Sequence, residues 1–308
     1  MAGSNEPPLV AIGPEPAPDW LADAVVDGGG QVVPLTESEA LVWASVDDVD
    51  GLRRALAGAP AVGWVQLPWA GVENFADVID EERIWTCGKG IYAEPVAELA
   101  LTLALAGLRR LDVYATATSW SEQLGRNLLD ANVTIVGGGG IAEALIALLR
   151  PFRCHITVVR STVQHMEGVD VVVESDRLVD ALPGADVVVL ALALTPETDG
   201  LIGADELALM EPHAWLVNVA RGRHVVTDDL VVALAGGVIG GAGLEVTEPE
   251  PLPDDHPLWR LENCIITPHT GTTPEMSRPL LAERVRDNVR RFAAGDELIG
   301  LVDARSGY

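Results

Sequence analysis

Short apolar runs rich in β-branched residues alternate with longer Ala- and Leu-rich segments along most of this chain. Such alternation is typical of βαβ units, in which buried parallel strands are covered by helices, and it predicts an α/β fold. The first third holds enough candidate strands for a small doubly wound domain: 9–12, 31–34, 40–43, 62–66 and 84–86. A second series follows: 133–136, 156–159, 169–173, 186–190, 214–219, 238–244 and 264–267.

The two series of strands predict two domains, which a length of 308 residues allows at roughly 150 residues per domain. Between them, the segment 94–111 is too rich in Leu and Ala to be a solvated surface helix, and we expect it to cross between the domains. The last helix is expected at about 273–294. Its apolar residues are spaced to suit a return to the first domain: Leu280, Leu281, Val285 and Val289.

Acidic residues outnumber basic residues by 46 to 20, which gives a formal net charge of −26. A field of that sign repels phosphate backbones and anionic lipids, so nucleic acids and membrane surfaces are poor candidate partners. Cys87, Cys154 and Cys264 lie far apart, which fits reduced thiols and disfavours a metal site. Because Met1 to Pro8 lacks a signal-peptide pattern and no uncharged apolar run approaches 18 residues, we expect a cytoplasmic protein.

A glycine cluster joins the strand candidate 133–136 to a helical segment. The run Gly137 to Ala142 matches G-x-G-x-x-A, in which the first glycine allows a tight turn and Gly139 lets backbone amides approach a pyrophosphate. The small side chain of Ala142 allows close helix packing. Four glycines could also form only a flexible turn, but the strand before and the helix after favour a dinucleotide site.

The strand candidate 156–159 ends at Arg160, Ser161 and Thr162, where the dinucleotide motif usually has an acid that binds the ribose 2′-hydroxyl. A guanidinium flanked by two hydroxyls would instead bind a 2′-phosphate. The sequence therefore predicts a preference for NADP(H), with NAD(H) possible. The alternative is that Arg160 is an ordinary exposed loop arginine.

Three residues with complementary chemistry, Arg221, Glu250 and His269, each follow one of the later strand candidates. Ligands bind at the carboxyl ends of strands in an open α/β sheet, so these residues form a candidate site. Arginine can bind a carboxylate bidentately, and histidine beside a carboxylate can transfer a proton near neutral pH. Hydride transfer to a 2-oxo acid needs these groups and a positioned nicotinamide. Taken singly, each residue could be structural or merely solvated.

The order and spacing of several segments resemble the D-isomer-specific 2-hydroxyacid dehydrogenase family, closest to its glyoxylate and hydroxypyruvate reductase branch: 71–72, 137–142, 218–222, 245–252 and 267–271. The resemblance implies two doubly wound parallel-sheet domains. A Rossmann cofactor domain, 102–275, would be inserted into a flavodoxin-like substrate domain formed by 1–101 and 276–308. It also implies a homodimer and a small 2-oxo or 2-hydroxy acid as substrate.

The same resemblance assigns roles to individual residues. It implies that Arg221 binds the substrate carboxylate and carbonyl, that His269 is the general acid in reduction, and that Glu250 pairs with His269. Backbone amides near Gly71 and Val72 would help to bind the substrate. The implied cofactor contacts all lie in the second series: Gly137, Gly139, Gly140, Ile141, Arg160, Ser161, Thr162, Thr195, Val219, Ala220, Glu245 and Gly271.

Two residues depart from the family pattern. Glu245 stands where Asp is usual and is expected to contact the nicotinamide carboxamide, and Trp69 stands where a small residue is usual before the substrate loop. Trp69 would either narrow the substrate pocket or lie at a domain or dimer contact. We expect an NADPH-dependent reductase that converts small 2-oxo acids such as glyoxylate or hydroxypyruvate to D-2-hydroxy acids. The alternatives are a nucleotide-sensing regulatory protein on the same fold and a phosphoglycerate dehydrogenase-like enzyme.

Overall fold

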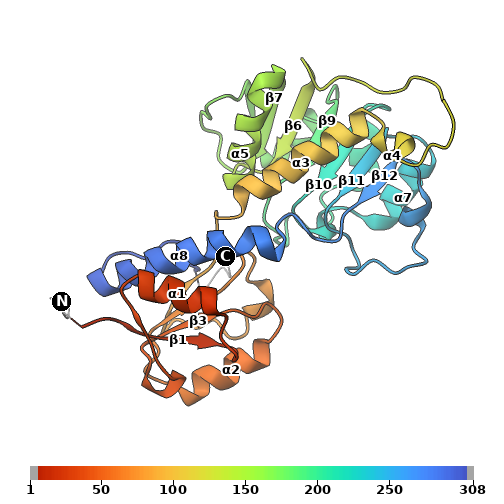
Figure 1. The fold of residues 1–308 in the computed structure, drawn as a ribbon. Helices are drawn as coiled ribbons and strands as arrows, with labels where there is room; N and C mark the ends of the chain where they lie inside the picture. Colours follow the sequence, from red (N-terminus) through yellow and green to blue (C-terminus); the bar gives the residue numbers. More distant parts are fainter. Residues whose placement is uncertain (1–5, 304–308) are drawn as a thin grey trace. The chain divides into compact units, whose positions relative to one another are not determined.

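A computed structural model describes residues 6–303, which divide into two compact units (Figure 1). Unit 1 comprises 6–92 and 273–303 of the described chain, and unit 2 comprises 93–272. Each unit contains one all-parallel sheet, so the expected α/β class with two parallel-sheet domains is confirmed. Most of the N-terminal segment used above to exclude a signal peptide lies outside the described residues.

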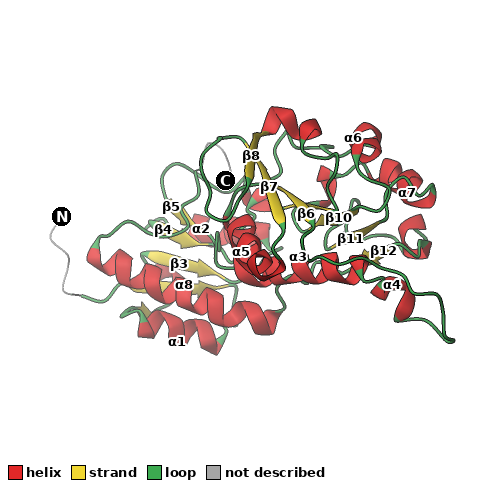
Figure 2. Cartoon of the chain, turned by 90° about the horizontal axis from the view of Figure 1, so that it is seen from above, coloured by secondary structure: helices red, strands yellow, loops and turns green. Residues whose placement is uncertain are grey.

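Unit 1 has a five-stranded sheet in the order β2-β1-β3-β4-β5. Helices α1 and α8 lie side by side and pack together in this unit (Figure 2). Val285 and Val289 of α8 are buried with α1 and β1, as the spacing of apolar residues predicted. The elements are β1 (Leu9–Gly13), α1 (Asp19–Asp27), β2 (Gln31–Val32), η1 (Leu35–Glu37), β3 (Ala40–Trp43), α2 (Val49–Gly58), β4 (Trp64–Gln66), η2 (Glu73–Phe75), β5 (Ile84–Thr86) and α8 (Pro274–Ala294), where η denotes a 3₁₀ helix.

Unit 2 has a seven-stranded sheet in the order β12-β11-β10-β9-β6-β7-β8, and apolar clusters cover both of its faces. The elements that form the sheet and its flanking helices are α3 (Ala93–Leu108), α4 (Leu111–Tyr114), β6 (Asn132–Val136), α5 (Gly140–Leu149), η3 (Arg150–Phe152), β7 (His155–Arg160), β8 (Val171–Glu174), η4 (Ser175–Asp180), β9 (Val187–Leu190), α6 (Ala204–Leu209), β10 (Trp215–Asn218), η5 (Gly222–His224), α7 (Thr227–Ala235), β11 (Gly241–Leu244), η6 (Pro257–Arg260) and β12 (Cys264–Ile266).

The units meet in the chain at 92/93 and 272/273, whereas the sequence placed the boundaries at 101/102 and 275/276. The difference arises because α3 packs along its whole length on elements of unit 2, beside α5, β10 and β11. Near its C-terminal end, Gly107 lies so close to the indole of Trp215 on β10 that an added Cβ would be 2.2 Å from the ring. Among the described residues, no helix is both long and apolar enough to cross a membrane.

Candidate active site

The glycine turn between β6 and α5 has the conformation that the motif requires. Gly137 has φ 118°, and a Cβ added there would lie 2.1 Å from the carbonyl oxygen of Ala191. Gly139 is exposed, and an added Cβ would meet no atom within 4 Å, so the space beside this backbone is open. Ala142 is fully buried where α5 packs on the sheet. The turn therefore leaves the N-terminus of a ten-residue helix accessible to a ligand.

This arrangement fits a dinucleotide. The first amides of a helix have no partners within the helix, and with the helix dipole they favour a phosphate group. The open face at Gly139 lets a pyrophosphate approach those amides without meeting a side chain. Gly140 and Ile141 begin α5 and lie at the same place, so four of the expected cofactor residues are brought together.

Arg160 is the last residue of β7, and its side chain lies over the glycine turn. A Cβ added to Gly138 would be 3.0 Å from both Cδ and Nε of Arg160. Ser161 and Thr162 follow as exposed residues. The guanidinium of Arg160 therefore lies beside the candidate pyrophosphate site, and Ser161 and Thr162 follow it in the chain.

Three further expected cofactor residues follow β9 and β10. Thr195 is exposed, and its amide donates to the hydroxyl of Thr198 at 2.8 Å. Val219 and Ala220 are buried directly after β10. The amide of Val219 bonds the carbonyl of Leu190 at 3.3 Å, which ties the ends of the two strands together.

Arg221 is presented by a tight turn that Asn218 shapes. The Asn218 amide group donates to the carbonyl of Arg221 at 2.8 Å, and its oxygen accepts from the amide of Ala220 at 3.0 Å. A Cβ added to Gly222 would lie 1.9 Å from the carbonyl oxygen of Thr247, so this turn is packed directly on the loop after β11. The close approach fixes the loop of Arg221 against the loop that carries Glu250. Asn218 was not among the expected site residues, although it stands at the end of a buried strand.

His269 and Glu250 form the expected pair. Nδ1 of His269 lies 2.6 Å from Oε1 of Glu250, and both side chains are about half exposed. Because Nδ1 is engaged, Nε2 is the ring nitrogen that can exchange a proton with a ligand. The loops of Arg221, Glu250 and His269 follow β10, β11 and β12, which are neighbours in the sheet, so all three loops emerge at its carboxyl edge.

Glu245 lies between these loops and is 2% exposed. One of its carboxylate oxygens accepts from the hydroxyl of Thr267, and the other accepts from the amide of Gly271. Gly271 is itself buried and packs beside Val96 of α3. The structure thus places both residues together within unit 2, with their polar groups bonded to each other.

The expected substrate loop, with Trp69, Gly71 and Val72, belongs to unit 1. The ring of Trp69 packs on that of Tyr92, with centroids 4.9 Å apart at an interplanar angle of 52°. The Tyr92 hydroxyl donates to the carbonyl of Pro68 at 2.8 Å, and burial raises the pKa of this phenol. Val72 is buried, which anchors the far end of the loop.

Arg284 of α8 supports a neighbouring loop in unit 1 and was not anticipated. Its guanidinium donates to the carbonyls of Cys87 at 2.8 Å and Lys89 at 3.0 Å. Burial lowers the pKa of Arg284 and raises that of the Cys87 thiol. The available signal was an arginine on the apolar face of α8, directly before Val285.

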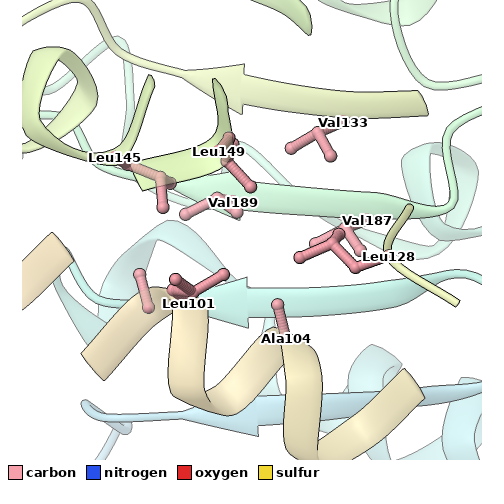
Figure 3. A pocket seen from close by; sticks show the side chains of 9 residues that line it. Leu101, Ala104, Leu128, Val133, Leu145, Leu149, Val187 and Val189 are labelled. Atoms are coloured by element: carbon pink, nitrogen blue, oxygen red, sulfur yellow. The ribbon is translucent and has the colours of Figure 1, made fainter. Parts of the chain in front are cut away.

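A small cavity lies within the core of unit 2 rather than at these loops (Figure 3). Its volume of about 10 Å³ is room for roughly one water molecule. The side chains that line it, among them Leu101, Leu145 and Val189, are all apolar. It is a packing defect without polar partners for a ligand. Within 6–303, the His, Cys, Asp and Glu side chains form no group of three that could bind a metal ion.

Comparison with known proteins gives consistent matches. Residues 99–271 match the family model described as D-isomer specific 2-hydroxyacid dehydrogenase, NAD binding domain. A glyoxylate reductase of Thermococcus litoralis is 32% identical over 85% of this chain and 82% of its own length. An uncharacterized protein in the proB 3′ region of Corynebacterium melassecola is 36% identical over 92% of this chain and 95% of its own. A D-isomer specific 2-hydroxyacid dehydrogenase from Xanthobacter autotrophicus, solved with NADPH and MES, aligns over the full length of both chains with a TM-score of 0.83 and 26% identity.

The glycine turn, the sheet order and the polar groups at the carboxyl edge define, with these matches, an NAD(P)-dependent oxidoreductase. The chain belongs to the D-isomer specific 2-hydroxyacid dehydrogenase family, in the branch similar to glyoxylate/hydroxypyruvate reductases. The family expectation drawn from the sequence is therefore confirmed.

Proposed function

We propose that this enzyme reduces small 2-oxo acids, such as glyoxylate or hydroxypyruvate, to D-2-hydroxy acids with NADPH. The observation that carries the proposal is the His269–Glu250 pair, which lies on the same sheet edge as Arg221 and in the same unit as the dinucleotide turn. The name of the Thermococcus relative, glyoxylate reductase, supports the choice of substrate.

When bound, the nucleotide would supply the hydride. Arg221 would bind the substrate carboxylate and polarise the neighbouring carbonyl, because a guanidinium offers several donors in one plane. His269 would transfer a proton from Nε2 to the carbonyl oxygen as negative charge develops there. Glu250 would hold the ring in place through Nδ1 and stabilise its protonated form. We also assign substrate-carboxylate binding to the loop at Gly71 and Val72.

The experiment is a set of initial rates for purified protein with NADPH or NADH and a panel of 2-oxo acids. We expect His269→Gln to lose at least about 100-fold in kcat while NADPH binding stays within twofold, since a general acid contributes about 10² to 10⁴. A matched control is His155→Gln, because His155 pairs with Asp170 at 3.3 Å at the amino end of β7, with similar exposure. Unchanged turnover by His269→Gln would remove His269 from the mechanism. No turnover of any panel member by the wild type would favour a nucleotide-sensing role.

We infer the preference for NADPH from the position of Arg160 beside Gly138, and the NADPH bound to the Xanthobacter structure supports it. Arg160→Asp should reduce the ratio of kcat/KM with NADPH to that with NADH by about 100-fold or more, because a phosphate contact is replaced by like-charge repulsion. Arg177→Asp is the control, since this exposed arginine pairs with Asp180 after β8. An unmoved ratio would show that another group binds the 2′-phosphate.

We further propose a homodimer formed through unit 2. The loop after α4 projects from the body of this unit (Figure 2), and it carries Trp120, a residue that is 96% exposed. Leu111 and Leu124 are also exposed on the same segment. Large exposed apolar patches mark protein–protein interaction sites, and we propose that these side chains contribute to one. Sedimentation velocity should show a dimer for the wild type and weakened association for Trp120→Ser, and a wild-type monomer at micromolar concentration would contradict the proposal.

A further inference from the structure

Glu245 is joined to the loop of His269 through its main chain. Its carbonyl oxygen accepts from the amide of His269 at 3.0 Å, and its own amide donates to the carbonyl of Asn218 at 3.0 Å. The amide of Thr267 bonds the carbonyl of Leu244, the preceding residue, at 2.9 Å. The main chain at 245 therefore connects the turn of Arg221 to the loop of the proton donor.

The carboxylate of Glu245 adds two further links to the same loop. It accepts from the hydroxyl of Thr267, two residues before His269, and from the amide of Gly271, two residues after it. The group is almost fully buried, so neither bond is open to competition from bulk water. One side chain thus holds the loop on both sides of the catalytic imidazole.

The loop needs such support because His269 has φ 51°. A residue other than glycine occupies the left-handed region only where the surroundings maintain it. The side chain itself is about half exposed, and its Nδ1 contact to Glu250 fixes only the ring. The His269 amide also makes a local bond to the carbonyl of Thr267 at 3.0 Å, and the bonds made by Glu245 then connect this backbone to the neighbouring strand end and to both sides of the loop.

We propose that Glu245 is a positioning residue that holds the 267–271 loop, and with it the His269 imidazole, in the geometry needed for proton transfer. This role rests on the proposed function of His269 and differs from direct contact with the nicotinamide. The carboxylate acts through hydrogen bonds that it accepts, so what matters is its reach and its acceptor atoms rather than its charge.

The length of the side chain follows from the same geometry. Aspartate at this position would withdraw the carboxylate by about one C–C bond, roughly 1.5 Å, whereas hydrogen-bond lengths vary only over about 2.7–3.2 Å. The shorter side chain would therefore lose its hydrogen bond to Thr267, to Gly271 or to both. Glutamine keeps the length, because its oxygen can accept from the Gly271 amide while its NH₂ donates to the Thr267 hydroxyl.

The test compares Glu245→Asp and Glu245→Gln with Glu248→Asp, a control that makes the same shortening at an exposed position three residues away. Amide hydrogen exchange of the ligand-free protein is measured for 267–271. We expect Glu245→Asp to exchange at least tenfold faster there, with kcat about 10- to 100-fold lower and the NADPH KM within threefold, since a displacement of about 1 Å can reduce rates 10²-fold. Glu245→Gln should retain both protection and kcat within about threefold.

Two results would overturn the proposal. One is normal exchange and kcat in Glu245→Asp with a raised NADPH KM, which would assign Glu245 to the nucleotide. The other is a large loss of kcat in Glu245→Gln with the loop still protected, which would show that the charge is required. If Glu245→Asp fails to fold by circular dichroism, the glutamine variant decides alone. Absence of turnover in the wild type would refute the proposed function, while exchange would still decide whether Glu245 holds the loop.

Discussion

Alanine substitutions at two glycines of the same turn should affect different properties: Gly137→Ala should destabilise the fold, and Gly139→Ala should weaken nucleotide binding. Gly137 and Gly139 are two residues apart, but only Gly137 is enclosed by protein and has a positive φ. Gly139 has φ −94° and ψ −168°, which is extended backbone that alanine adopts readily. The pair therefore separates the part of the motif that the fold requires from the part that a ligand requires.

The magnitudes follow from the surroundings. A methyl group on Gly137 would lie 2.1 Å from the carbonyl oxygen of Ala191, and it would force alanine to φ 118°. Overpacking and backbone strain each cost about 1–3 kcal/mol, so we expect Gly137→Ala to lower the free energy of unfolding by about 3–5 kcal/mol. A Cβ added at Gly139 would meet no atom within 4 Å. Gly139→Ala should therefore raise the free energy of unfolding by 0 to about 1 kcal/mol, because alanine reduces the conformational entropy of the unfolded chain.

Nucleotide binding should show the reverse pattern. The methyl group of Gly139→Ala would occupy the space that a pyrophosphate needs, so we expect the Kd for NADPH to rise at least about tenfold, about 1.4 kcal/mol. Urea unfolding followed by circular dichroism measures stability, and quenching or enhancement of NADPH fluorescence measures binding. Gly58→Ala is the control, because it is equally open and lies in unit 1. Wild-type NADPH affinity in Gly139→Ala, or destabilisation equal to that of Gly137→Ala, would refute the reasoning.

Two further predictions concern the buried interior. Asn288→Ala should lower the free energy of unfolding, measured by urea denaturation, by about 2–4 kcal/mol. The substitution removes the hydrogen bonds of 2.8–2.9 Å that Asn288 makes to Gln66 and to both backbone groups of Ile299. A change below about 0.5 kcal/mol would contradict this. Burial raises the pKa of Cys154 to about 11 and that of Cys264 to about 12. At pH 8 at most about one of these thiols in a thousand is then ionised in the native protein, and the thiolate is the form that reacts. Because unfolding removes the burial, iodoacetamide should label both cysteines at least 100-fold faster in 8 M urea than in the native protein, as followed by mass spectrometry.

The strands were predictable because a buried parallel strand must be apolar on both faces. Every expected strand overlaps an observed one, with differences of a few residues at the ends. The largest shift is in β11, expected from 238 and observed from Gly241. The apolar residues Val238 and Ile239 belong instead to the connection after α7, and Ile239 is buried there. Hydrophobicity alone does not distinguish a strand from a buried connection.

The positions of helix ends and domain boundaries could not be predicted from the pattern of apolar residues alone. The helix expected to reach 111 ends at Leu108, and Arg110 has φ 55°, a left-handed conformation that separates α3 from α4. The crossing near 101 was implied by the family resemblance. The packing partner of α3, Trp215 on β10, lies more than 100 positions away, so only the structure shows that the whole helix belongs to unit 2.

The candidate site was predictable where chemistry is carried by residue type at the end of a strand. The pairing of His269 with Glu250 followed from the resemblance, and in the structure Nδ1 of His269 lies 2.6 Å from Oε1 of Glu250. The partners of Glu245 did not follow, because they depend on the path of the main chain through His269. A carboxylate next to a polar loop can point to a ligand or to the loop itself, and its direction is set by backbone angles that a sequence does not reveal.

The net charge of −26 makes partners with extended phosphate backbones poor candidates, but it is compatible with a bound nucleotide. Charges more than about 8–10 Å apart are largely screened at physiological ionic strength, so a bound phosphate responds mainly to its immediate neighbours. In the proposed site those neighbours would be the amides at the start of α5 and the guanidinium of Arg160. The same reasoning applies to Arg221 and a substrate carboxylate. In the proposed site, affinity for small anions would therefore be a local property of the sheet edge. The sequence features that predict it are the glycine turn and two arginines rather than the overall composition.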